Sequence, residues 1–245
     1  MSKLKEVVRF ELSTSLRYLL IFYTIQYSVV AVTLFLTWLG RGSLDHPYFA
    51  ALESCAMIFV LIFGAVGFNE DFKMLLQNGF TRRVHFVGAL VLFASTAALL
   101  ALVDTLAARA LEGVAHGYWS AFAALYGPNH ALVLQFLWRY GVYLVLVCVG
   151  YFCALLTARL GTKRMFVLSI AVLLICTIVL PGPLMARSPN WLVIHLSTWI
   201  ENTLYHCAGF TAEGVQLVNP LLSLAVLAVL GFAACFALLR RAPLR

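Results

Sequence analysis

Three ionisable side chains stand inside long apolar runs of the sequence, where a charge needs a chemical reason. Glu53 lies near the start of the second apolar run along the chain, Asp104 late in the third, and Arg139 in the fourth. A charge in hydrocarbon is costly, so such groups face protein or water and pair with one another. Either Glu53 or Asp104 can pair with Arg139. Two roles remain open: polar contacts that hold helices together, or the lining of a substrate path.

The histidines give no pattern of a catalytic or metal site. His195 and His206 lie in one connection, and no further ligand completes a metal set there. His85 has no evident Ser, Cys or carboxylate partner, so an intramembrane enzyme has little support. No Gly-x-x-x-x-Gly-Lys-Ser/Thr phosphate loop occurs, so the chain has no ATPase site of its own. We therefore expect no catalytic residue, metal or cofactor in this chain.

A short helix is predicted over 70–79, in the connection between the second and third apolar runs. Glu70 and Asp71 place negative charge at its start, where the helix dipole favours it. Asn78 and Gly79 tolerate a left-handed backbone and therefore end a helix readily. The connection is therefore predicted to contain regular secondary structure.

This predicted helix carries an apolar face. Phe72, Leu75 and Leu76 follow one another at spacings of three and one, which places them on one side of a helix. Such a face needs cover, either under the chain's own spans or in a groove on another subunit. Thr81 is expected to cap the following helix, and Arg82 to anchor that helix at the lipid headgroups.

Long apolar elements must position all of these residues. The chain has 245 residues, of which 63% are hydrophobic and 11% charged, whereas a soluble domain is about 25% charged. A transmembrane β-barrel needs alternating segments of about ten residues, and the runs here are continuous. The sequence predicts a single all-α, polytopic membrane domain over 1–245, with six transmembrane helices at about 19–39, 47–68, 86–108, 132–157, 165–186 and 216–239.

The basic residues predict the orientation of these spans. Of the 17 Lys and Arg, 13 fall in the amino-terminal segment, the second and fourth connections and the carboxyl tail. These segments alternate, so they share one side of the membrane, and the positive-inside rule makes that side cytoplasmic. We expect both termini inside, in the cytoplasmic membrane of the cell. The net charge of +7 then reflects topology, and no nucleic-acid partner is expected.

Two amphipathic segments flank the spans. Apolar residues at spacings of three and four among basic ones predict an interfacial helix over 2–18. The outer connection contains a second apolar stretch, 191–210, which is too polar to span the bilayer. Trp191 and Trp199 favour the membrane interface, so short extracytoplasmic helices are expected there.

The combination resembles permease subunits of the ABC-2 type, which are six-span membrane components of bacterial ABC exporters. Those permeases have an amphipathic amino-terminal helix, a coupling helix after the second span, and interfacial helices between the last two spans. The matching segments here are 2–18, 70–79 and 191–210. The string from Glu70 to Arg82, EDFKMLLQNGFTR, is also similar to an acidic-aromatic and then Asn-Gly-x-Ser/Thr-Arg pattern of one bacterial branch.

The resemblance implies a permease subunit of an ATP-driven exporter of lipid, peptide or drug-like substrates. It would form the pathway as a dimer, with a second copy or a similar permease, above two ABC ATPase subunits that carry the ATP and Mg²⁺. The contacts with the ATPase would come from Glu70, Asp71, Phe72, Leu75, Leu76, Asn78, Gly79 and Arg82. The alternative is an ion- or proton-coupled secondary transporter, with Glu53, Asp104 and Arg139 as the polar residues of its pathway.

Overall fold

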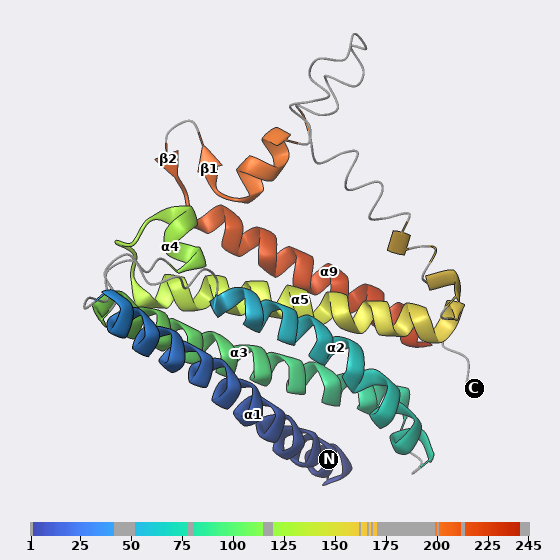
Figure 1. Cartoon of the computed structure of the whole chain (residues 1–245). Helices are drawn as coiled ribbons and strands as arrows, with labels where there is room; N and C mark the ends of the chain where they lie inside the picture. The colour runs from blue at the N-terminus through green and yellow to red at the C-terminus, as the bar shows by residue number, and fades with distance from the viewer. Residues whose placement is uncertain are drawn as a thin grey trace. The chain divides into compact units, whose positions relative to one another are not determined.

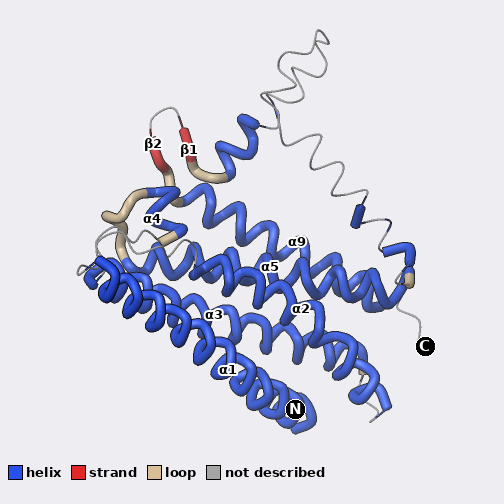
Figure 2. The backbone as a smooth tube through the Cα atoms, in the orientation of Figure 1, coloured by secondary structure: helices blue, strands red, loops and turns tan. Residues whose placement is uncertain are grey.

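The computed structural model is almost entirely helical in the part that it describes (Figures 1 and 2). That part comprises residues 2–41, 52–77, 81–114, 120–161, 163–165, 167, 169–170, 199, 201–211 and 214–240. The chain divides into two compact units, Met1–Tyr151 and Phe152–Arg245. Each unit is described by itself.

The first unit is built from four long helices and one short one. The elements are α1 (Ser2–Arg41), α2 (Leu52–Gln77), α3 (Arg82–Val114), α4 (Ala121–Tyr126) and the first part of α5 (Leu132–Leu160). Helix α3 packs against both α1 and α2 (Figure 1). The predicted cap of α3 is confirmed, because the amide of Val84 donates to Oγ1 of Thr81 over 3.4 Å.

Aromatic contacts show that successive long helices run in opposite directions. Phe22 of α1 stacks on Phe59 of α2 at a centroid separation of 4.3 Å. Phe93 of α3 meets Phe63 of α2 and Tyr151 of α5 edge to face, at 6.2 and 5.2 Å. The polar contacts described below lie at a different level along the same helices. Going from the aromatic contacts to the polar ones, residue numbers rise on one helix of each pair and fall on the other, so each long helix is antiparallel to the next.

Two glycines let α2 and α5 touch through their backbones. A Cβ atom added to Gly64 would collide with the carbonyl of Val147, and one added to Gly150 would collide with the carbonyl of Leu61. Small residues at helix crossings are the usual way for membrane helices to approach closely. The two helices therefore cross at a fixed point about halfway along α2.

The second unit contains α9 (Val218–Arg240) and a small hairpin before it. Residues 201–207 are helical, and an antiparallel pair follows, β1 (Phe210–Thr211) with β2 (Gly214–Val215). Gly209 turns the chain between the two with a φ of 86°, and a Cβ there would lie 2.8 Å from Cδ of Pro220. The interfacial segment expected over 191–210 is thus helical in its described later part, and it ends in a hairpin that the sequence did not predict.

Four described helices are long and apolar enough to cross a membrane: Ser15–Gly40, Arg82–Gly113, Leu132–Leu160 and Val218–Arg240. They correspond to the predicted first, third, fourth and sixth spans, and they confirm an all-α chain of multi-pass membrane type. The apolar part described in α2, Glu53–Val66, is shorter. The fifth predicted span, 165–186, lies almost wholly outside the described residues, so the number six stays a prediction.

The helices also differ from the predicted boundaries. The structure has one uninterrupted helix from Ser2 to Arg41, so no helix boundary separates the interfacial segment 2–18 from the span after it. At 40 residues, α1 is about 60 Å long, twice the hydrocarbon thickness of a bilayer. The helix start predicted at Glu70 is likewise wrong, because α2 continues through it to Gln77.

The apolar surface of α1 faces outward from its unit. Leu20, Ile25 and Leu39 are 69%, 61% and 66% exposed. Large apolar side chains exposed along a whole helix are unfavourable in water and natural in lipid. The exposed face of α1 is therefore a lipid-facing or subunit-facing surface.

Candidate functional site: a buried polar cluster

The most distinctive group in the first unit is an ion pair buried between α2 and α5. Nε of Arg139 donates to Oε1 of Glu53 over 2.7 Å, and its Nη2 lies 2.6 Å from the same oxygen. The two residues are 1% and 3% exposed. A buried pair of this kind survives only when hydrogen bonds satisfy its remaining polar atoms.

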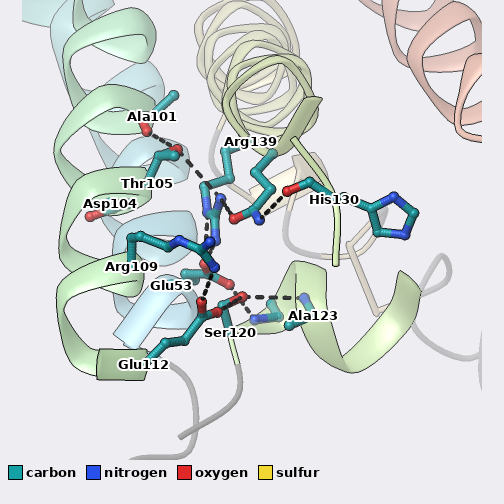
Figure 3. A network of polar contacts seen from close by, with 12 residues as sticks. Glu53, Ala101, Asp104, Thr105, Arg109, Glu112, Ser120, Ala123, His130 and Arg139 are labelled. Atoms are coloured by element: carbon teal, nitrogen blue, oxygen red, sulfur yellow. Dashed lines mark hydrogen bonds and ion pairs between the residues drawn. The ribbon is translucent and has the colours of Figure 1, made fainter. Parts of the chain in front are cut away.

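Neighbouring side chains supply such hydrogen bonds to Nη1 of Arg139 (Figure 3). Nη1 of Arg139 lies 3.4 Å from Oγ1 of Thr105 and 3.5 Å from Oε1 of Gln135. Thr105 in turn donates to the carbonyl of Ala101, and Gln135 to that of His130, over 2.6 and 3.2 Å. The guanidinium group is thus held by α2, α3 and α5 at once. We call Glu53, Thr105, Gln135 and Arg139 the polar cluster.

The second carboxylate oxygen of Glu53 binds the start of α4. The amide of Ala121, the first residue of that helix, donates to Oε2 of Glu53 over 2.5 Å. Ser120 caps the helix from the position before, because its Oγ accepts the amide of Ala123 over 3.2 Å. A carboxylate at a helix amino terminus is favoured by the unpaired amides and the helix dipole. Glu53 therefore neutralises an arginine and anchors α4.

Aromatic packing holds the rest of α4. Phe122 is fully buried and meets Trp138 edge to face at a centroid distance of 5.7 Å. Tyr126, in the last turn, meets the same indole at 6.1 Å. Burial raises the pKa of Tyr126 above its ordinary value. The short helix thus packs against α5 at Trp138, the residue directly before Arg139.

Asp104 belongs to a separate polar group. It is 5% exposed, and its Oδ2 accepts from the hydroxyl of Tyr143 over 2.5 Å. Its Oδ1 lies 3.0 Å from the hydroxyl of Tyr23. That hydroxyl also lies 3.2 Å from the carbonyl oxygen of Leu100. Two phenols from α1 and α5 therefore hold a carboxyl group of α3.

A small cavity separates the two carboxyl groups. Its volume is about 10 Å³, and it is lined by Gln26, Tyr27, Glu53, Asp104, Ala107, Ala108 and Leu111. That volume is about the least that one water molecule needs. The cavity is enclosed by α1, α2 and α3, and it is too small for an organic substrate.

The structure resolves the pairing that the sequence left open. Glu53, and not Asp104, is the partner of Arg139. Tyr23 and Tyr143 were missed, because a tyrosine in an apolar run carries no sign of what its hydroxyl contacts. Helix α4 was also missed, although Ser120 before AFAALY and Gly127 after it form a readable start and stop signal.

The predicted coupling residues are placed only in part. Glu70, Asp71, Phe72, Leu75 and Leu76 lie in the last two turns of α2, and their side chains fall outside the described part of the structure. Asn78 and Gly79 also lie outside the described residues. Arg82 is the first residue of α3.

The second unit holds an open groove of about 580 Å³. Trp199, Asn202, Thr203, His206 and Cys207 line one side, and Asn219, Leu222 and Ser223 of α9 line the other. Within the described residues no three His, Cys, Asp or Glu side chains gather as a metal site would require. Among the described residues, the buried charges of the first unit are the most distinctive polar groups. No family model, curated protein or solved structure matches this chain.

Proposed function

We propose that this chain is the membrane-spanning permease subunit of an ATP-driven ABC exporter. It works as a dimer, with a second copy or a similar permease, and two separate ATPase subunits bind its cytoplasmic side. The chain contributes no ATPase chemistry, and ATP and Mg²⁺ belong to the partners. The proposal is supported by the sequence pattern between Glu70 and Arg82 together with the apolar helices of the fold.

One observation carries the proposal: α2 is a single helix from Leu52 to Gln77. Its 26 residues give a length of about 39 Å at 1.5 Å per residue. The segment from Glu70 onward, expected to contact the ATPase, forms one end of this helix. Glu53, with its buried ion pair, lies at the other end. A displacement at the ATPase end therefore reaches the polar cluster through a continuous helix.

The crossing with α5 gives that helix a pivot. Gly64 lies between the two ends of α2, and the backbone of α5 touches α2 there. A rigid element held at one point tilts when one end is pushed. Closure of the ATPases on ATP would thus rock α2 about Gly64, an alternating-access change of the rigid-body kind.

Pull-down of the ATPase subunit tests the proposal. The double variant Phe72→Asp with Leu75→Asp should abolish co-purification, because two charges replace the apolar side chains that dock. Leu125→Asp is the matched control: it makes the same kind of change at an exposed leucine of α4, away from that end of α2, and should leave binding intact. Full binding by the double variant would count decisively against the proposal.

A second candidate is an ion- or proton-coupled transporter that uses Glu53, Asp104 and Arg139. The observation that favours it is the position of Asp104: no described residue forms an ion pair with this buried carboxyl group. Reconstituted vesicles separate the two candidates. Transport that needs ATP and the ATPase supports the exporter, whereas transport that persists without ATP and collapses with the proton gradient supports the coupled transporter.

A further inference from the structure

The buried charges of the first unit do not balance if both carboxyl groups are ionised. Arg139 supplies one positive charge, and it forms an ion pair with Glu53. Among the described residues the other ion pair is Arg109 with Glu112, at the surface of α3. Asp104, 5% exposed, would leave one uncompensated negative charge inside a membrane-spanning helix. Such a charge is costly, and a carboxyl group avoids that cost by binding a cation or a proton.

The hydrogen bonds around Asp104 suit a carboxyl group that holds a proton. When Asp104 is ionised, the hydroxyls of Tyr23 and Tyr143 donate to its two oxygens. When a proton binds Oδ1, that O–H donates to the hydroxyl oxygen of Tyr23, 3.0 Å away. The Tyr23 hydroxyl then rotates and donates to the carbonyl of Leu100, 3.2 Å away. Tyr143 still donates to Oδ2, so every polar atom named keeps a partner.

The cavity beside Asp104 favours a proton over a metal cation. At about 10 Å³ it has room for one water molecule at most, so a hydrated sodium ion does not fit. Both oxygens of Glu53 on its other wall are already bound, by Arg139 and by the amide of Ala121. A metal ion would thus lack the full set of oxygen ligands that hard cations require.

We propose that Asp104 is a buried proton-binding site, and that proton binding moves the Tyr23 hydrogen bond from Asp104 to the Leu100 carbonyl. The reaction adds one proton to the carboxylate and breaks no covalent bond. The inference holds whether the chain is an exporter subunit or a coupled transporter. The ionisable side chains that face Asp104 are Tyr23 and Tyr27 from α1, Glu53 from α2, and Arg139 and Tyr143 from α5.

Infrared spectroscopy of the full chain in lipid tests the proposal directly, since a protonated carboxyl group has its own C=O stretching band. The wild-type protein should show this band in neutral buffer and lose it reversibly in alkaline buffer. Asp104→Asn should remove the band. Glu112→Gln, which alters a carboxyl group at the surface of α3, should keep it. Asp104→Glu keeps the carboxyl group but displaces it, so the band should shift in frequency.

Thermal unfolding gives a second readout. An unfolded Asp is ionised at neutral pH, so a folded state that holds the proton releases it on unfolding. The unfolded state then binds fewer protons, and stability falls as the pH rises, by up to about tenfold in the unfolding equilibrium per pH unit. Asp104→Asn should flatten this slope relative to the wild type, whereas Glu112→Gln should not.

Three results would overturn the proposal. The first is a wild-type protein without the carboxyl band at neutral pH. The second is a band that survives in Asp104→Asn, which would assign it elsewhere. The third is loss of the band on adding sodium chloride at constant pH, with potassium chloride as the control, which would identify a metal cation in place of the proton. If Asp104→Asn does not fold, the frequency shift in Asp104→Glu assigns the band, and an unshifted band there would overturn the proposal.

Discussion

At the scale of single residues, Arg139 is the side chain on which the first unit most depends. Its guanidinium contacts α2 through Glu53, α3 through Thr105, and a residue of its own helix, Gln135. Truncation of the Arg139 side chain leaves Glu53 as an uncompensated buried charge, and this destabilises a protein more than replacing both partners by apolar residues.

Arg139→Met is therefore expected to destabilise the protein by about 3–5 kcal/mol. The double variant Arg139→Met with Glu53→Leu should cost less, because no buried charge is left alone. Thermal unfolding of the wild type and the variants in the same detergent measures both effects.

The exposed pair Arg109–Glu112 is the control for this experiment. Nη1 of Arg109 lies 3.2 Å from Oε2 of Glu112, and the Arg109 side chain is 55% exposed. Arg109→Met should cost about 0–1 kcal/mol, the usual range for surface pairs. Equal losses for Arg139→Met and Arg109→Met would show that burial does not set the strength of the Glu53–Arg139 pair.

The sequence identified the three buried charged residues but not their arrangement. Glu53 and Asp104 stand at similar depths, and nothing in the two runs indicates which carboxyl group reaches Arg139. The choice depends on how α2, α3 and α5 are rotated about their axes. That rotation is set by contacts such as Gly64 against Val147, which appear only when the helices are packed.

At the scale of elements, the crossing of α2 and α5 brings the backbones of two helices into direct contact. Each glycine there faces the other helix's backbone, which cannot move aside as a side chain can. The crossing therefore requires glycine at Gly64 and Gly150, for reasons of space and not of backbone conformation.

Gly64→Ala and Gly150→Ala should each destabilise the protein by about 1–3 kcal/mol, as overpacking commonly does. Gly113→Ala is the matched control, since a Cβ there meets no atom within 4 Å. That control should be neutral or should stabilise α3 by up to about 1 kcal/mol. Thermal midpoints of the three variants check this, and tolerance of alanine at both Gly64 and Gly150 would contradict the crossing.

The element boundaries were harder to predict than the elements themselves. Glu70 and Asp71 resemble a helix start, but α2 runs through them, because Glu is a good helix former and Asp costs less than about 1 kcal/mol in a helix interior. The break predicted between 18 and 19 is absent in α1 for a similar reason. An amphipathic stretch and an apolar stretch are both helical, so no local signal separates them.

At the scale of the whole molecule, the alternating helix directions bring alternate helix ends together at each end of the first unit. The amino ends of α1 and α3 and the carboxyl end of α2 share one end of the unit, where Arg9 and Arg83 are exposed. The polar cluster and α4 lie toward the other end. The predicted orientation makes the end with Arg9 and Arg83 cytoplasmic.

Cysteine labelling tests which end of the first unit faces the cytoplasm. Arg83→Cys and Asn129→Cys, each in a chain whose native cysteines are replaced by alanine, introduce thiols at exposed positions near opposite ends. A maleimide that cannot cross the membrane should label Asn129→Cys on intact cells. It should label Arg83→Cys only after the cells are opened. Labelling of both variants on intact cells would contradict the predicted orientation.

The buried ion pair also has a consequence for how the chain enters the membrane. Glu53 and Arg139 are 86 positions apart, so during synthesis the acidic residue emerges long before its basic partner. Glu53 of α2 therefore has no basic partner until α5, which carries Arg139, has been synthesised. Each charge lowers the cost of inserting the other. We therefore expect α2 to stay near the growing chain until α5 is made.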